Sequence, residues 1–135
     1  MNPYTKFFYI HKFTAVTPAI VPSTWYNELG SKMVITDVDP SGAFKGTYSS
    51  AVGNAKYTYP LTGQYDTQGS TLGWAVTWQN QSLNAHSTTT WSGQLQSDSM
   101  LITRLLTSQM PSENDWKFTN VQGFDIFTQT PIPAN

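Results

Sequence analysis

The sequence predicts an all-β protein with the fold of an eight-stranded antiparallel up-and-down β-barrel. Short runs rich in Val, Ile, Thr, Tyr and Trp recur from residue 24 onward, which is typical of strands. The segments between them are short and rich in Gly, Asn, Asp and Ser, so consecutive strands are expected to pair antiparallel. No long stretch has helical periodicity. Closure removes both sheet edges, and we therefore favour a barrel over a two-layer sandwich.

Eight strands are expected, separated by turn-like segments. They cover residues 24–29, 32–38, 44–51, 57–65, 72–79, 86–95, 99–107 and 117–129. Pro60 falls inside the fourth strand and has no N–H to donate, so we expect a bulge or a strand break there. Side chains alternate along a strand, so every second residue of each run shares one face of the sheet.

Length and composition limit the classes of function. A chain of 135 residues predicts one domain, here a barrel over 23–130 with a C-terminal tail over 131–135. Residues 1–22 contain three prolines and only a short apolar run, so we expect an irregular N-terminal arm or a leader remnant. The net charge of −1 and the 11% of charged residues argue against a nucleic-acid or membrane partner. The absence of cysteine excludes disulfides and thiolate metal sites.

The faces expected to point inward carry more polar groups than a barrel core needs. They are Trp74, Val76 and Trp78; Ser87, Thr89 and Trp91; Tyr48, Ser50 and Val52; and Gly123, Asp125 and Phe127. A barrel filled only for packing would use Val, Ile and Leu at these positions. Buried hydroxyls and a carboxylate need hydrogen-bond partners, and a small ligand with matching donors and acceptors would supply them.

Six stretches of the chain resemble the avidin/streptavidin family of biotin-binding proteins, in the family's order. They are TWYNELGS (24–31), GTYSSAVGNA (46–55), YDTQGSTLGWAVTWQN (65–80), NAHSTTTWSGQ (84–94), LLTS (105–108) and QGFDIFT (122–128). The resemblance covers about residues 24–130. It implies the same eight-stranded barrel that the strand pattern predicts, with biotin as a bound ligand and neither a cofactor nor a metal.

Position by position, the resemblance implies hydrogen bonds to the ureido group of biotin. Asn27, Ser31 and Tyr48 would donate to the ureido oxygen. Three donors at one oxygen polarise it in the way an oxyanion hole does, without chemistry following. Asp125 would accept from one ureido N–H and Ser50 from the other. The bond to a buried carboxylate would be charge-assisted, and so stronger than a neutral one.

The resemblance also implies contacts to the rest of the ligand. Thr89 would reach the ring sulfur. Ser87 and the backbone N–H of Asn54 would hold the valerate carboxylate. Trp78 and Trp91 would form walls against the bicyclic ring, each burying a large apolar area.

Further family positions imply a loop, a floor and an assembly. Val52 and Gly53 would belong to a flexible loop that closes over the ligand, and Leu106 would line the floor. Trp116 would lie in a loop that crosses to a neighbouring subunit and caps its pocket, which favours a homotetramer. Family members are usually exported and commonly sequester the vitamin, so secretion and that role are expected by analogy, although no clear signal peptide is visible.

One position departs sharply from the family pattern. The family has a Trp directly before LLTS, and this chain has Arg104 there. In the interpretation that we favour, Arg104 points inward on the same face as Leu106, removes an aromatic wall and lowers biotin affinity. Its guanidinium would then pair with Asp125 or extend out at the barrel end. In the alternative, a local bulge turns the side chain outward. Phe124, where streptavidin has a His, faces the opposite way and should affect subunit contacts.

Other classes of function are less well supported. A catalytic triad of Ser87, His86 and Asp125 fails because His86 and Ser87 are adjacent on one strand and point to opposite faces. The chain is therefore expected not to be an enzyme. A sugar-binding module, a binder of a biotin analogue and a degenerate family member whose pocket no longer binds remain alternatives, and Arg104 would be the cause of the last.

Overall fold

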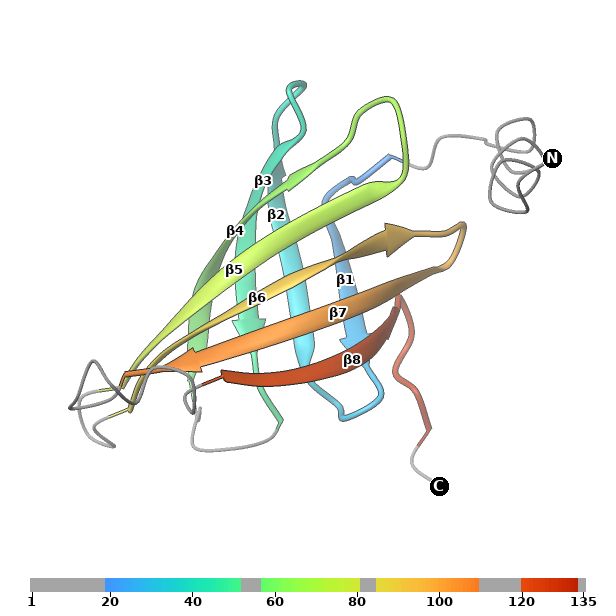
Figure 1. Ribbon diagram of the computed structural model, residues 1–135. Coiled ribbons are helices and arrows are strands. Elements are labelled where there is room, and N and C mark those ends of the chain that lie inside the picture. Colours follow the sequence, from blue (N-terminus) through green and yellow to red (C-terminus); the bar gives the residue numbers. More distant parts are fainter. Residues whose placement is uncertain (1–18, 52–56, 81–84, 110–119, 134–135) are drawn as a thin grey trace, which may run out of the picture.

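The computed structural model describes residues 19–51, 57–80, 85–109 and 120–133. Eight β-strands follow one another along this part of the chain (Figure 1): β1 (Ser23–Asn27), β2 (Lys32–Val38), β3 (Ala43–Ser49), β4 (Thr58–Tyr65), β5 (Thr71–Asn80), β6 (Ala85–Leu95), β7 (Ser99–Ser108) and β8 (Asn120–Thr128). In these ranges no helix is long and apolar enough to cross a membrane.

The strands form a closed barrel in which each strand pairs with the next in the order β1 to β8. All neighbours are antiparallel, and the barrel closes where Tyr26 and Asn27 of β1 pair with Thr128 and Phe127 of β8. The predicted fold is therefore confirmed, and every predicted strand end lies within three residues of the observed one. Short connections and alternating apolar patterning are sufficient to specify this topology.

The prediction of a bulge or a strand break at Pro60 is wrong. Strand β4 runs through Pro60 without a register shift, and Pro60 pairs with Thr47 of β3. The ladder from β4 to β5 begins only at Leu61, so the missing N–H removes no hydrogen bond to β5. The register shift lies instead between Ile35 and Asp37 in the pairing of β2 with β3.

The barrel interior holds a continuous core of large side chains. Phe44, Phe127, Met33 and Met100 are at most 1% exposed. Their positions obey the alternation along each strand, as expected for a barrel whose inner face excludes water. Ile20 is also part of this core, so the segment before β1, expected to be an irregular arm, supplies at least one core side chain.

The two ends of the barrel differ in which connections they carry. We call the end at which β1, β3, β5 and β7 finish the lower end, and the end at which β2, β4 and β6 finish the upper end, as oriented in Figure 1. The upper end is held by short turns, including one in which Gly42 takes the left-handed φ of 96° that favours glycine. The predicted ligand-contacting residues that the structure describes lie toward the lower end.

Candidate functional site

Buried polar side chains gather in the lower half of the barrel. Within the described ranges the buried polar or charged residues are Asn27, Ser31, Thr89 and Asp125, each at most 3% exposed. Each of them is a site residue predicted from the sequence. A buried polar group costs free energy unless it is hydrogen-bonded, so their partners define what the site can do.

Asp125 on β8 is the centre of this cluster. Its Oδ1 accepts a hydrogen bond from Asn27 Nδ2 at 3.3 Å and pairs with the guanidinium of Arg104, and its Oδ2 accepts from Trp91 Nε1 at 3.1 Å. A carboxylate offers about four lone-pair positions. The described donors occupy three of them, which leaves about one acceptor position, on Oδ2, for a further N–H group.

The β1–β2 connection is folded around the side chain of Asn27. Asn27 Oδ1 accepts from the backbone N–H of Leu29 at 3.1 Å and of Ser31 at 2.8 Å, so the amide nitrogen is the end that faces Asp125. Gly30 takes a φ of 87°, a left-handed conformation that glycine adopts without strain. The turn thereby places Ser31 beside Asn27 inside the barrel.

Tyr48 on β3 supplies a buried phenol to the same cluster. Burial is the main cause that raises the pKa of the Tyr48 phenol well above its ordinary value, the charge of Asp125 adds to the shift, and a hydrogen bond with Ser31 and the charge of Arg104 oppose it. The phenol therefore stays protonated throughout the neutral range. It can act there as a hydrogen-bond donor.

Three aromatic rings surround the polar cluster. The centroid of Tyr48 lies 4.8 Å from that of Trp91 and 5.8 Å from that of Trp78, and the two indoles are 6.3 Å apart at 69°. Trp78 Nε1 donates to Thr89 Oγ1 at 2.8 Å. This bond fixes the Trp78 indole and leaves the hydroxyl proton of Thr89 available to another acceptor.

Arg104 points into the barrel, so the alternative in which a local bulge turns its side chain outward is wrong. The ladders through Arg104 are regular, with Trp91 opposite on β6 and Gly123 opposite on β8. The guanidinium pairs with Asp125 and donates to the backbone oxygen of Phe124 at 2.9 Å, while 30% of the side chain remains exposed. The structure thus combines the two arrangements expected for an inward arginine, pairing with the carboxylate and reaching toward solvent.

The remaining predicted residues fall into two groups. Ser50, Ser87 and Leu106 are half-buried. The predicted loop residues Val52, Gly53 and Asn54, and the predicted capping residue Trp116, lie outside the described residues.

Two residues beside the cluster, Glu28 and Trp74, were not among the predicted site residues. Glu28 Oε2 accepts from the backbone N–H of Ile126 at 2.9 Å, beside the cluster. Trp74 stacks on Trp91 with centroids 5.5 Å apart and planes inclined by 13°, and its buried Nε1 has no hydrogen-bond partner among the described residues. Trp74 shares the inward parity of Trp78, which is the signal that could have added it to the site.

The geometry argues against the rival chemistries. His86 is exposed, whereas Ser87 faces the interior, so the imidazole cannot take the proton of its neighbour's hydroxyl. In the part of the chain that is described, no group of three or more His, Asp or Glu side chains is placed to hold a metal ion.

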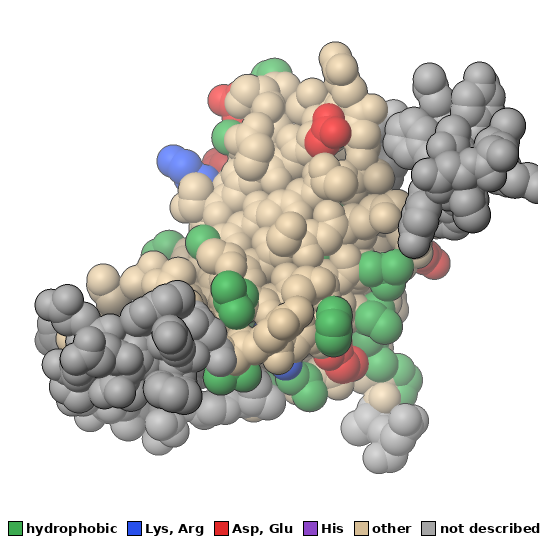
Figure 2. Space-filling model, in the orientation of Figure 1, with side chains coloured by type: hydrophobic (Ala, Val, Ile, Leu, Met, Phe, Trp, Pro, Cys, Tyr) green, Lys and Arg blue, Asp and Glu red, His purple; other side chains and the backbone are tan. Residues whose placement is uncertain are grey.

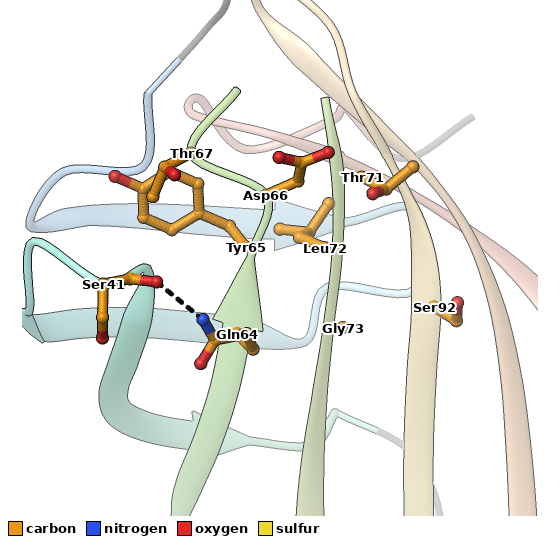
Figure 3. A pocket seen from close by; sticks show the side chains of 9 residues that line it. All are labelled: Ser41, Gln64, Tyr65, Asp66, Thr67, Thr71, Leu72, Gly73 and Ser92. Carbon is orange, nitrogen blue, oxygen red and sulfur yellow. Dashed lines mark hydrogen bonds between the residues drawn. The ribbon is translucent and has the colours of Figure 1, made fainter. Parts of the chain in front are cut away.

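A hollow lies on the surface at the upper end, away from the cluster. Figure 3 shows its polar lining, in which Gln64 Nε2 donates to the backbone oxygen of Ser41 at 2.8 Å. Its volume is about 540 Å³. Its lining contains no residue predicted to contact a ligand, and Asp66 there already accepts from the backbone N–H of Gln68 at 2.9 Å.

Fold and cluster together define a small up-and-down β-barrel with a polar, aromatic-lined interior at one end. The model of the Avidin family matches residues 15–130, and the chain is 36% identical to avidin of Gallus gallus over 118 residues, covering 78% of this chain and 74% of that protein. The chain belongs to the avidin family. Proteins of this family are binding proteins without catalytic activity, which confirms that the chain is not an enzyme.

Solved structures share the fold. The X-ray structure of a biotin binding protein from chicken is 31% identical, with a TM-score of 0.69 over 80% of this chain and 94% of that chain. The crystal structure of Xenavidin is also 31% identical, with a TM-score of 0.71 over 80% and 95%. Apo shwanavidin, at 22% identity, matches with a TM-score of 0.72 over 86% and 100%, and supports the fold alone.

Proposed function

We propose that this protein binds biotin, without catalysis, at the lower end of the barrel. The single observation that carries the proposal is the state of Asp125, a buried carboxylate whose Oδ2 keeps about one acceptor position beside the indole of Trp91. Membership of the avidin family and the similarity to a biotin binding protein from chicken support it.

The donors and acceptors of the cluster complement a cyclic urea. Such a ring offers one strongly accepting oxygen and two N–H donors. Asn27, Ser31 and the protonated phenol of Tyr48 supply donors for the oxygen, and Asp125 and Ser50 supply acceptors for the two N–H groups. Partners fixed in place by a folded barrel lose little entropy on binding, which favours affinity.

The aromatic residues complement the flat faces of the bicyclic ring. Trp78 and Trp91 form walls that are already held by their indole N–H bonds to Thr89 and Asp125, so the ligand need not order them. Thr89 donates its free proton toward the ring sulfur. Leu106 lies on the same inward face as Thr89, its partner in the β6–β7 ladder, and forms the floor.

The outer end of the ligand is assigned from the family alone. Ser87 and the backbone N–H of Asn54 hold the valerate carboxylate, and Val52 and Gly53 form the loop that closes over it. Secretion and sequestration of the vitamin belong to the same proposal by family analogy.

The affinity of the site is set in part by Arg104. The family's aromatic side chain at this position would add a third indole wall, which the aliphatic stem of arginine does not replace. The guanidinium also takes one acceptor position of Asp125, the carboxylate that binds the ureido N–H. We therefore propose a lower biotin affinity than a tryptophan at residue 104 would give.

A homotetramer is the proposed assembly. The outward faces of β7 and β8 carry exposed apolar side chains: Leu101, Leu105, Phe124 and Ile126, from 44% to 73% exposed. Figure 2 shows hydrophobic side chains gathered over these two strands. Contiguous exposed apolar patches on soluble proteins mark interaction surfaces. Trp116 would complete the neighbour's pocket, as in the family.

The test is calorimetric titration of the full chain with biotin, together with a light-scattering measurement of mass in solution. We expect one biotin per chain and a particle of four chains. No heat and no binding at millimolar biotin would refute the proposed function and favour a degenerate family member. A second titration with free sugars is expected to give no signal, and saturable sugar binding would favour the carbohydrate module instead.

A further inference from the structure

In the closure of the barrel, most of one edge of β8 has no backbone partner among the described residues. Only Tyr26 and Asn27 of β1 pair with β8, at its end, whereas β7 pairs with β8 over nine residues. From Asn120 to Ile126 the described residues of β1 offer β8 no ladder. An open strand edge exposes N–H and C=O groups that need partners.

Two charged side chains supply partners to this edge. Glu28 Oε2 accepts from the N–H of Ile126 at 2.9 Å, and Arg104 donates to the carbonyl of Phe124 at 2.9 Å. Residues two apart along a strand direct their backbone groups to the same side, so both bonds lie on the edge that faces β1. We call Glu28 and Arg104, with the edge they cap, the seam.

Arg104 reaches the seam by passing over Gly123. A Cβ placed on Gly123 would lie 2.5 Å from Nη2, 2.6 Å from Cζ and 2.9 Å from Nε of Arg104. The guanidinium therefore occupies the volume that any other residue at position 123 would fill. Gly123 has no left-handed φ, so its need for glycine is spatial and not conformational.

We propose that Arg104 is a positioning residue, seated on Gly123, that orients Asp125 and closes the seam instead of presenting its charge to the ligand. One guanidinium nitrogen bonds both the carbonyl of Phe124 and Oδ1 of Asp125. This pair of bonds holds Oδ1 toward the seam and turns Oδ2 toward Trp91. The consequence for ligand binding rests on the proposed function, because Oδ2 is the acceptor assigned to the ureido N–H.

The first test measures thermal unfolding of the ligand-free protein in a double-mutant cycle. Gly123→Ala is expected to lower Tm by about 3 °C or more when Arg104 is present, because the guanidinium must leave its seat and its bonds. In the Arg104→Ala background the same change is expected to leave Tm unchanged or raise it, because alanine suits a strand better than glycine. Equal Tm shifts in the two backgrounds would show that the guanidinium does not occupy the space over Gly123. If Arg104→Ala does not fold, Arg104→Gln provides the second background.

The second test reads the orientation of Asp125 directly. Trp91 Nε1 donates to Asp125, whereas Trp25 Nε1 donates to Ser23 Oγ at 2.8 Å, a partner outside the seam. We expect Gly123→Ala and Arg104→Gln to shift the indole N–H resonance of Trp91 in the NMR spectrum and to leave that of Trp25 in place. An unmoved Trp91 resonance in folded variants would show that Arg104 does not position the carboxylate.

The third test is biotin titration of the same variants. Displacing Arg104 by Gly123→Ala is expected to weaken binding about tenfold, since Oδ2 loses its orientation but not its charge. Unchanged biotin affinity in a variant with a shifted Trp91 resonance would show that the orientation of Asp125 by Arg104 does not affect ligand binding. Failure of the unmodified protein to bind biotin would instead refute the proposed function. The Tm cycle and the NMR shift would still test whether Arg104 lies over Gly123 and positions Asp125.

Discussion

Replacing Asp125 by asparagine separates the charge of the acceptor from its shape. The amide is close in size to the carboxylate, so packing in the barrel is retained. Its two ends differ, because one is an oxygen acceptor and the other a nitrogen donor. Arg104 and Asn27 both donate to the Oδ1 side, and we therefore expect the amide oxygen to occupy that side. The amide nitrogen then takes the place of Oδ2.

The magnitude follows from what the ligand meets at that place. In the proposed binding mode a ureido N–H donates to the Asp125 carboxylate of the unmodified protein, and such a bond contributes about 1.5–3 kcal/mol. In the variant the N–H meets another donor and is left unsatisfied, which costs about 1–3 kcal/mol. Since the two contributions overlap, we expect a loss of about 2–4 kcal/mol, which is a Kd increase of roughly 30- to 700-fold.

Calorimetry with biotin measures the effect, with competition by a weaker ligand where direct titration saturates. Asp98→Asn is the matched control, because Asp98 is exposed in the turn between β6 and β7 and loses the same charge without touching the site. The control should bind as the unmodified protein does. A loss below about threefold for Asp125→Asn, in a folded protein, would mean that the carboxylate does not accept from the ligand.

Three further predictions address the aromatic wall, the phenol and the assembly. Arg104→Trp should raise biotin affinity at least tenfold in a titration, since the added indole wall outweighs the loss of the bond that orients Asp125, and an unchanged Kd would contradict this role. Because burial raises the pKa of Tyr48, the phenol contributes stability that is complete below about pH 10 and is lost as pH rises further. Urea unfolding from pH 8 to 11 should show a loss of stability above about pH 10, with a slope approaching about 1.4 kcal/mol per pH unit, that Tyr48→Phe removes, and identical profiles would refute it. Phe124→Asp should dissociate the proposed tetramer in light scattering, because Phe124 is 73% exposed on the apolar face, whereas Ser97→Asp in the β6–β7 turn should not.

The alternating pattern of the strands predicted most of the fold. Alternation along β5 and β6 placed Trp74, Trp78, Thr89 and Trp91 on the inner face, and all four are buried. This works because a strand has a fixed period of two and a barrel has one dry face. The register shift near Asp37 left no comparable signal, because a bulge depends on the pairing of two strands and not on one run of sequence.

The interior arrangement of Arg104 was only partly predictable. Parity and the cost of an unpaired guanidinium predicted an inward side chain that seeks Asp125. The route over Gly123 was not predictable, because it depends on which residue of β8 lies opposite Arg104, and that register becomes visible only when the barrel closes. The same holds for Glu28, whose partner Ile126 is 98 residues away in the chain.

The most direct test of the central claim is an atomic structure of the protein with biotin bound. We predict the ureido ring between Trp78 and Trp91, with one ring nitrogen within about 2.7–3.2 Å of Asp125 Oδ2 and the Arg104–Asp125 pair retained. Biotin bound in the upper surface hollow of Figure 3, or anywhere out of reach of Asp125, would contradict the claim.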